Sequence, residues 1–379
     1  MRTYCKRLDL LGDAHLSAAY EAFARGKRNK PEFGRFFERP RAEVFDEARA
    51  MVRARLLTLP AITYFERTEP TNGKVRLIAR ESAMQQFMDY VCVTALQPML
   101  DAKVGYHQCG SVRGKGQAHA RRYVERWVRD RRSRWYAKLD VRKYYPSVDR
   151  ARLMAMLRRD VRDEDLLWLV EALLSTHGQG LNIGSYLSQA LANYYLSGMV
   201  RMASEAARER RSRRRGEFVR ERLVSHILTY MDDVLIVGHD KANVKACARL
   251  IVRYLRDELG LEAKPWKVCS VDCEPVDICG FVFRRDRVTV RAGIFLRGRR
   301  ALLAAKRARR VTPMAAARCV SYWGYFKHSD TRLWQMGNDI QGTVERCKRV
   351  VSAAARNGGF HERGLGVRGA GARRTAPAA

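Results

Sequence analysis

Short segments in which apolar and polar residues alternate are separated by longer segments with helical periodicity. Alternation at every second residue indicates a strand with one buried face. Two alternating runs flank Thr71-Asn72-Gly73, and Asn-Gly is a strong hairpin signal. A second hairpin is expected where two apolar runs flank Tyr230-Met231-Asp232-Asp233. Further strands are expected at residues 135–140 and within 276–290.

Apolar residues spaced three and four apart predict helices along most of the remaining chain. Asp149 precedes one such segment and can cap its first turn, whereas Pro98 is expected to end another. A helix is also expected after Gly184. The other expected helices lie within residues 1–60, at 82–100, from 117 onward, at 150–159, 164–175 and 241–259, and from 296 to about 355. Strands and helices in one chain predict an α+β fold.

Three aspartates are placed where a divalent cation could bind. Asp232 and Asp233 are adjacent in the second hairpin, and neighbouring strand residues reach one site only where the chain bends. Close carboxylates repel each other unless a cation lies between them. Asp140 ends an apolar strand and also calls for a cation, because buried carboxylates are rarely without a partner. The alternative is an exposed turn, in which Asp is common.

The charge of the chain indicates a class of ligand. Lys and Arg number 73 against 40 Asp and Glu, which gives a net charge of +33. Such an excess indicates a polyanionic partner, and nucleic acid is favoured over a membrane surface. The sequence has no apolar run of the roughly 18 residues that a membrane span needs, and its N-terminus does not resemble a signal peptide. A cytoplasmic protein without a membrane partner is therefore expected.

Three further segments carry compositional signals. The arginine-rich run at 208–222 is expected to form a partly flexible surface loop or helix. Residues 357–379 are rich in Gly, Ala and Arg and are expected to be disordered. Cys269, Cys273 and Cys279 come nearest to a metal cluster, but their spacing fits no familiar zinc motif, so buried free thiols are favoured.

Two groups of cations lie where phosphates could bind. Lys74 and Arg76 project from one face of the second strand of the first hairpin, where they suit a triphosphate. A solvated basic strand face is the simpler alternative. Arg113 and Lys115 lie in a glycine-rich loop at 105–116, which lacks the P-loop pattern and is interpreted as a contact to a nucleic-acid backbone.

An ordered series of motifs resembles the successive sequence blocks of reverse transcriptases. The series is KVRLIAR, GYHQCGSVRGKG, YAKLDVRKYYPSVD, GLNIGSYLSQ, YMDD, a lysine-bearing segment and ICGFVF, with SYWGYFKHSD beyond it. The resemblance implies a right-hand polymerase fold with fingers, a palm made of an antiparallel sheet with helices on one face, and a helical thumb. The implied divisions are a basic helical extension (1–60), fingers (61–135), palm (136–283, with finger helices inserted at about 150–180), thumb (284–356) and tail (357–379).

The resemblance also implies an RNA-directed DNA polymerase that uses two Mg²⁺ ions, or Mn²⁺ in their place. Asp140, the backbone of Val141, Asp232 and Asp233 are the implied metal ligands. Asp233 is the expected weaker ligand, because it neighbours Asp232 and so points partly away. Lys264 is a candidate proton donor to pyrophosphate, with Lys267 or a plain surface role as the alternatives.

Further residues are implied to contact the nucleotide or the nucleic acid. Lys74 and Arg76 would bind the triphosphate, and the Tyr145 ring would exclude a ribose 2′-hydroxyl while Tyr144 faces the core. Ile183, Gly184 and Gln189 complete the expected substrate-binding set. Arg113, Lys115, Tyr230 and Met231 are the expected nucleic-acid contacts.

Two positions in GLNIGSYLSQ narrow the resemblance to one class of reverse transcriptases. Ile183 stands where most reverse transcriptases have glutamine, and Gln189 where most have proline. This combination resembles the enzymes of diversity-generating retroelements, which copy a template RNA with errors opposite adenines and so diversify a target gene. The implied partners are template RNA, the RNA–cDNA hybrid, deoxynucleoside triphosphates and a small basic accessory protein. The alternatives are a group II intron-, retron- or defence-associated reverse transcriptase, and a non-catalytic RNA-binding relative.

Overall fold

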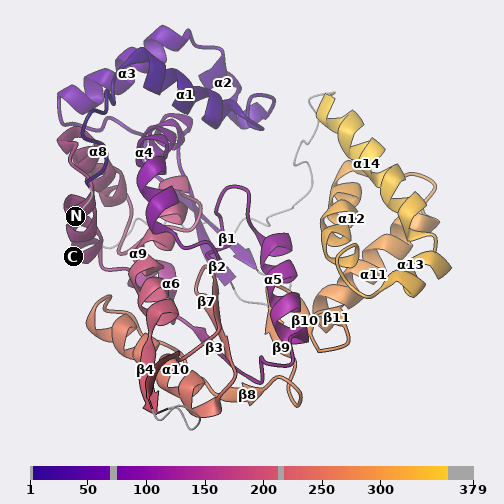
Figure 1. The fold of residues 1–379 in the computed structure, drawn as a ribbon. Helices are drawn as coiled ribbons and strands as arrows, with labels where there is room; N and C mark the ends of the chain where they lie inside the picture. Colours follow the sequence, from indigo (N-terminus) through magenta and orange to yellow (C-terminus); the bar gives the residue numbers. More distant parts are fainter. Residues whose placement is uncertain (1–2, 69–74, 212–216, 357–379) are drawn as a thin grey trace.

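A four-stranded antiparallel sheet carries the second hairpin (Figure 1). The computed structural model describes residues 3–68, 75–211 and 217–356. The strand order is β6-β7-β3-β8, so that the two hairpin strands lie beside the strand that ends at Asp140. Its strands are β3 (Trp135–Asp140), β6 (His226–Tyr230), β7 (Asp233–Gly238) and β8 (Val268–Ser270).

Both faces of this sheet are buried. Ala137, Leu139 and Ile236 belong to the larger apolar core, together with residues of α9 (Tyr186–Glu205) and α10 (Lys241–Asp257). Tyr136, Leu235 and Val237 on the opposite face belong to a second core, which α5 (Gln117–Arg129) helps to form. The expectation of helices on one face is therefore incomplete, because near-continuous apolar strands need cover on both faces.

A small three-stranded antiparallel sheet also contributes to the second core. It consists of β9 (Val276–Ile278), β10 (Phe281–Phe283) and β11 (Val288–Val290), in the order β11-β10-β9. Each strand buries its first and third residues and leaves the second half-buried, as alternation predicts. This sheet leads directly into the C-terminal helices.

The first predicted hairpin is present as β1 (Thr63–Thr68) and β2 (Val75–Arg80). Its predicted turn, together with Lys74, lies outside the described residues. Apolar side chains on both strands are exposed, among them Phe65 and Leu77. This hairpin therefore relies on backbone pairing more than on burial of its outer part.

The arginine-rich run differs from the prediction of a flexible loop or helix. It forms a separate hairpin, the β4–β5 hairpin, from β4 (Ala207–Arg211) and β5 (Phe218–Arg222), and residues 212–216 between these strands lie outside the described part of the chain. The register brings opposite charges together, and an Arg208 guanidinium nitrogen lies 3.4 Å from a carboxylate oxygen of Glu221. Cross-strand pairs of this kind favour a ladder over a helix that would place like charges side by side.

Helices form the N-terminal lobe and line the larger core. Ser82 caps α4 (Ala83–Lys103), which continues through Pro98, so the predicted end there is wrong. Buried side chains of α4 on either side of Pro98 outweigh the roughly 3 kcal/mol that proline costs in a helix. The remaining elements of this part are α1 (Asp13–Ala24), η1 (Pro31–Phe33), α2 (Gly34–Phe37), α3 (Arg41–Arg53), α6 (Tyr144–Ser147), α7 (Arg150–Asp160) and α8 (Glu164–Ser175).

Four C-terminal helices form a lobe of their own around a third apolar core (Figure 1). They are α11 (Ala292–Arg307), α12 (Pro313–Phe326), α13 (Arg332–Gly337) and α14 (Ile340–Arg356). The expected helical segment from 296 to about 355 is thus present in four pieces. Residues 357–379, expected to be disordered, lie outside the described part of the chain.

Candidate functional site

The Tyr230–Asp233 turn is a tight two-residue loop. Tyr230 and Asp233 are register partners, so only Met231 and Asp232 lie between the strands. Met231 has a φ of 55°, which is uncommon for a residue with a side chain. Such a conformation persists where surrounding contacts impose it, and it occurs most often at functional sites.

The sheet register brings the three predicted aspartates together. Asp140 is the direct cross-strand partner of Asp233, and paired residues project from the same face about 5 Å apart at Cβ. The backbone of Asp232 is held to the same strand end, because the Val141 N–H donates to its carbonyl at 3.2 Å. Val141 itself is buried, and the predicted role of its backbone in metal binding stays a prediction.

Two lysines balance these carboxylates. Lys264 Nζ lies 2.7 Å from Asp140 Oδ2, and the Lys264 N–H donates to the Asp140 carbonyl at 2.8 Å. Lys138 Nζ lies 3.0 Å from Asp233 Oδ1. Asp140 therefore has a cationic partner within the protein, whereas its role as a metal ligand stays a prediction. Lys138 was not among the predicted residues, although its place two residues before Asp140 puts it on the same strand face.

The adjacent aspartates face different neighbours. Burial raises the pKa of Asp232, with the negative charge of Asp233 as the next cause and Arg76 acting in the opposite direction. Burial also raises the pKa of Asp233, which Lys138 and Arg291 oppose. Asp232 therefore lies within electrostatic reach of the strand predicted to bind the triphosphate, whereas Asp233 lies nearer the start of the C-terminal lobe.

The donor chemistry of the site suits a hard divalent cation. Asp140 Oδ1 is buried without a hydrogen bond, and Mg²⁺ prefers such carboxylate oxygens. Among the described residues, no group of three or more His, Cys, Asp or Glu is close enough to form a complete cation site. Metal binding by Asp140, Asp232 and Asp233 therefore stays a prediction.

The tyrosine pair after β3 divides as expected. Tyr144 is buried, and its hydroxyl donates to the Ala192 carbonyl at 2.5 Å. Tyr145 is only half-buried, and its hydroxyl lies 3.8 Å from Met231 Sδ in the hairpin loop. The Leu181 N–H donates to the Tyr145 carbonyl at 2.7 Å, which attaches the backbone of Tyr145 to the segment before Ile183.

The Ile183–Gly184 segment packs on β2. The Ala79 N–H donates to the Ile183 carbonyl at 3.0 Å. Gly184 has a φ of +119°, and a Cβ there would lie 2.5 Å from the Ala79 carbonyl oxygen, so the close approach requires glycine. The Ile183 side chain is half-buried, and Gln189 lies in the first turns of α9, also half-buried.

The glycine-rich loop is hydrogen-bonded to neighbouring parts of the chain and also presents one cation to solvent. The Cys109 N–H donates to the Thr229 carbonyl at 2.9 Å, which attaches the loop to β6. Lys115 Nζ donates to the Gly105 carbonyl at 3.2 Å, whereas Arg113 is exposed. The two predicted cations are therefore not equivalent, because Lys115 stabilises the loop and Arg113 faces solvent.

A buried amide links this loop to the hairpin. Asn193 Nδ2 on α9 donates to the Gly110 carbonyl at 2.8 Å and lies 3.9 Å from Met231 Sδ. Gln108 is also buried and donates to the Asn193 carbonyl at 2.8 Å. Sequence reasoning missed both residues. Their only signal was an amide within an otherwise apolar helix and within a glycine-rich loop, which does not name a partner.

Tyr230, Lys267 and the three cysteines near residue 270 lie outside the aspartate pair of strand ends. Tyr230, at the end of β6, is half-buried against the second core, and burial raises its pKa to about 12. Lys267, the alternative to Lys264, pairs with Glu274 at 2.6 Å. The three cysteines near residue 270 are free thiols, of which Cys269 and Cys279 are buried and Cys273 is exposed. Their burial agrees with the favoured interpretation for two of the three.

Comparison with known families identifies the chain. Residues 67–283, more than half of its length, match the family described as reverse transcriptase (RNA-dependent DNA polymerase). The chain belongs to the reverse transcriptase family. A search of curated proteins returned no match.

Membership of the reverse transcriptase family supports RNA-directed DNA polymerase activity, a nucleotidyl transfer with an RNA template and deoxynucleoside triphosphates as substrates. Reverse transcriptases generally use divalent ions such as Mg²⁺. Within the described residues, no helix has the length and apolar character needed to cross a membrane. The match ends at Phe283, so it includes the aspartate-bearing sheet and excludes the four C-terminal helices.

Proposed function

We propose that this reverse transcriptase makes error-prone cDNA from a template RNA for the diversification of a target gene, as the enzymes of diversity-generating retroelements do. The proposal rests on one observation, which is Ile183 at a position where most reverse transcriptases have glutamine, with Gln189 in place of proline nearby. The packing of the Ile183–Gly184 segment on β2 supports a role at the nucleotide, since β2 also carries Arg76.

With isoleucine at position 183, the site lacks the polar side chain that glutamine would supply. A glutamine side chain could hydrogen-bond the incoming nucleotide or the template, whereas isoleucine offers only dispersion contact. A lost hydrogen bond removes discrimination on the order of 1 to 3 kcal/mol, which corresponds to roughly one or two decades in error rate. Errors opposite template adenine would increase accordingly.

The proposed chemistry assigns a role to each residue around the hairpin. Asp140 and Asp232 would be the main ligands of Mg²⁺, and Asp233 would assist. When bound, the ions would make the primer 3′-hydroxyl more nucleophilic and neutralise the triphosphate. Arg76, with Lys74, would bind the triphosphate, and Tyr145 would exclude a ribose 2′-hydroxyl. Lys264, which lies 2.7 Å from Asp140, would donate a proton to the leaving pyrophosphate.

The proposed partners follow the charge of the chain. Arg113, Lys115, Tyr230 and Met231 would contact the template RNA or the RNA–cDNA hybrid. A small basic accessory protein is proposed from the resemblance alone, and no described surface is assigned to it.

The deciding experiment is primer extension on an RNA template that contains adenines, with each misinserted nucleotide counted by sequencing. Ile183→Gln is expected to lower misinsertion opposite adenine by about tenfold or more, because glutamine restores a hydrogen bond that depends on pairing geometry. Errors opposite the other three template bases should change less.

Two control variants make the result specific. Ile183→Val keeps an apolar side chain of similar shape and should retain the wild-type error spectrum. Asp232→Asn should abolish extension, which shows that the measured synthesis belongs to this chain. An Ile183→Gln enzyme that extends primers with an unchanged adenine error rate would contradict the retroelement proposal and leave a reverse transcriptase of another class.

A further inference from the structure

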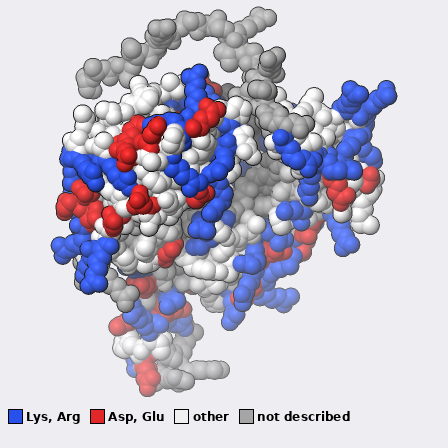
Figure 2. All heavy atoms as spheres, turned by 90° about the horizontal axis from the view of Figure 1, so that it is seen from above, with Lys and Arg blue, Asp and Glu red and all other residues white. Residues whose placement is uncertain are grey.

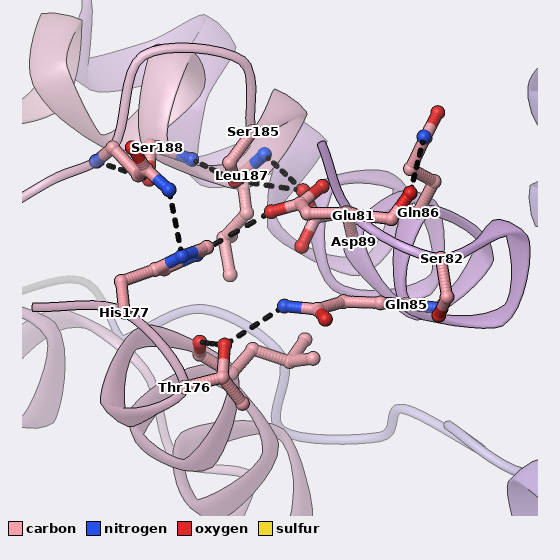
Figure 3. Close-up of polar contacts among 12 residues, drawn as sticks. Glu81, Ser82, Gln85, Gln86, Asp89, Thr176, His177, Ser185, Leu187 and Ser188 are labelled. Atoms are coloured by element: carbon pink, nitrogen blue, oxygen red, sulfur yellow. Dashed lines mark hydrogen bonds and ion pairs between the residues drawn. The ribbon is translucent and has the colours of Figure 1, made fainter. Parts of the chain in front are cut away.

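Three ionisable side chains lie buried close to one another, in contact with residues on either side of the Ile183–Gly184 segment (Figure 3). Glu81 follows β2, Asp89 lies in α4 and His177 follows α8, and these residues are 5%, 1% and 9% exposed. His177 Nε2 lies 3.3 Å from Glu81 Oε1. Two acids and one imidazole with so little access to water form an unusual group, because each charge needs a partner.

This cluster is bonded to both ends of the segment. At one end, Asn182 Nδ2 lies 2.8 Å from His177 Nδ1. At the other end, Asp89 Oδ2 accepts hydrogen bonds from Ser185 Oγ at 2.8 Å and from the Leu187 N–H at 3.0 Å. The bonds bracket Ile183 and Gly184 on either side.

Glu81 connects the same cluster to β2. It lies two residues after Ala79, whose N–H donates to the Ile183 carbonyl at 3.0 Å. The Gln86 side chain donates to the Glu81 carbonyl at 3.1 Å, so the end of the strand is attached to α4 as well. The position of the segment relative to the strand that carries Arg76 therefore depends on this buried group.

The protonation of the group is coupled to its geometry. The His177 ring is held between Asn182, which contacts Nδ1 at 2.8 Å, and Glu81, whose Oε1 lies 3.3 Å from Nε2. Burial raises the pKa of Asp89 well above its usual value, and the Glu81 carboxylate is the next cause. Neither Glu81 carboxylate oxygen has a hydrogen bond. The Glu81 carboxylate therefore opposes ionisation of Asp89.

Lys27 is a cation near the cluster, and the charges of Asp89 and Glu81 both favour its charged form. Lys27 Nζ donates to Gln86 Oε1 at 2.8 Å, and burial, with Lys30, lowers the pKa of Lys27 to about 8. The Cys92 thiol and the Tyr90 hydroxyl lie nearby on α4, and burial raises the pKa of each, so both stay protonated.

We propose that Glu81, Asp89 and His177 are positioning residues that hold the Ile183–Gly184 segment at the incoming nucleotide and thereby set the KM for deoxynucleoside triphosphates and the ratio of correct to incorrect insertion. The inference rests on the proposed placement of this segment at the nucleotide. A purely structural cluster would affect the melting temperature but not the nucleotide KM.

The direction of the pH effect follows from the raised pKa of Asp89. The folded protein holds the proton of Asp89 at pH values where a free aspartate has lost it, so the folded geometry is favoured below the raised pKa and is weakened as pH rises through it. Loss of the proton leaves two adjacent carboxylates that repel each other. The wild-type KM should therefore rise several-fold between about pH 6 and pH 9.

The test is single-nucleotide insertion on an RNA template, measured from about pH 6 to 9 for each of the four deoxynucleotides. Glu81→Gln keeps the shape of the side chain and removes its charge. It is expected to raise the nucleotide KM by about five- to tenfold at neutral pH and to change kcat by less than about threefold. It should also flatten the pH dependence of KM. Glu81→Asp should restore part of the pH dependence.

Asp160→Asn is the matched control. Asp160 is a fully buried acid bonded to Lys103 at 3.0 Å and to the Tyr194 hydroxyl at 2.8 Å, and within the described residues it makes no hydrogen bond or ion pair with the segment. It should lower the melting temperature and leave the nucleotide KM and its pH dependence unchanged. His177→Gln gives the same readout if Glu81→Gln does not fold.

A wild-type KM and pH profile in folded Glu81→Gln and His177→Gln enzymes would overturn the positioning role, as would an equal KM change in Asp160→Asn. This outcome differs from failure of the proposed function, which is read from the adenine error rate of Ile183→Gln. A change in KM with no effect of Ile183→Gln on errors would support the positioning role and reject the retroelement assignment.

Discussion

Three carboxylates gather at the end of β3 and in the adjoining hairpin, and two lysines hold them there. Lys264 pairs with Asp140 and Lys138 with Asp233, whereas no ion pair joins Asp232 to another side chain in the described part of the chain. Its burial and the charge of Asp233 both oppose its ionised form. A residue in this position destabilises the folded enzyme in the absence of a cation, which is a common cost of function.

Removing that charge should stabilise the protein. Asp232→Asn is expected to increase the free energy of unfolding in metal-free buffer by about 1 kcal/mol, because it removes repulsion with Asp140 and Asp233 and keeps the side-chain shape. Addition of Mg²⁺ should raise the melting temperature of the wild type and have much less effect on the variant, since a bound ion stabilises only the state that binds it. Calorimetry with and without Mg²⁺ measures both effects.

Asp257→Asn provides the comparison. This acid is exposed and pairs with its neighbour Arg256 at 2.7 Å, so its loss should leave the free energy of unfolding nearly unchanged and the Mg²⁺ response intact. A loss of stability in Asp232→Asn, or an undiminished Mg²⁺ response, would contradict the assignment of Asp232 as a ligand.

At this scale the sequence predicted acids better than their partners. Asp140 and the hairpin aspartates could be found because a carboxylate at the end of an apolar strand is unusual. Lys138, Asn193 and the cluster of Glu81 with His177 were not predicted, because each depends on contacts between residues far apart in the chain. Sequence spacing shows which face a side chain occupies and not what lies opposite.

At the scale of elements, the glycine-rich loop supports the hairpin that it touches. A Cβ on Gly110 would lie 2.8 Å from the Met231 backbone nitrogen and 2.7 Å from Met231 Cγ. Loop, α9 and hairpin therefore meet with no space for another atom. The unusual φ of Met231 is consistent with a turn held by its neighbours.

Gly110→Ala should consequently shift the hairpin loop. We expect kcat to fall by about tenfold or more, because a displacement of the aspartates by a fraction of an ångström disturbs the alignment of reacting groups. The free energy of unfolding should fall by about 1 to 3 kcal/mol from overpacking. Steady-state extension kinetics and urea unfolding measure the two effects separately.

Gly324→Ala is the matched glycine variant. Gly324 lies in α12 with nothing within 4 Å of the position of its Cβ, so alanine should raise stability by about 0.5 to 1 kcal/mol through helix propensity and leave kcat unchanged. If Gly110→Ala retains the wild-type kcat, the loop does not position the hairpin.

Local patterns predicted most elements, and tertiary packing accounts for the exceptions. Alternation predicted β1, β2, β3 and the second hairpin, and Asp149 caps α7 as expected, accepting the Arg152 N–H at 3.1 Å. The prediction that Pro98 ends α4 was wrong because burial of the helix outweighs its local cost. The arginine run was also predicted wrongly, because the pairing of β4 with β5 depends on residues 7 to 15 positions apart.

At the scale of the whole molecule, positive charge is spread over both lobes. Figure 2 shows Lys and Arg on the N-terminal lobe and on the C-terminal helices, and most of the visible Asp and Glu on the former. The β4–β5 hairpin adds five arginines against two glutamates. In Figure 1 this hairpin lies away from α11–α14, and β5 precedes the His226 end of β6, which is the end opposite to the aspartate-bearing turn. We therefore expect a short primer–template at the aspartates not to contact it. Its charge suits a longer RNA.

The salt dependence of binding separates these two parts of the surface. Each phosphate neutralised by a basic side chain contributes about 0.7 to 0.9 to the slope of log affinity against log salt. Arg220→Ala with Arg222→Ala should therefore lower that slope by about 1 to 2 for a long structured RNA and leave it unchanged for a short hybrid.

Arg39→Ala with Arg41→Ala removes the same charge from side chains already paired with Glu47 at 2.7 Å and Glu21 at 2.5 Å, and should not change either slope. Equal effects of the two double variants would mean that net charge, and not the hairpin, determines RNA binding. Because the comparison uses RNA length as the variable, it tests the hairpin as an extended RNA surface without depending on polymerase activity.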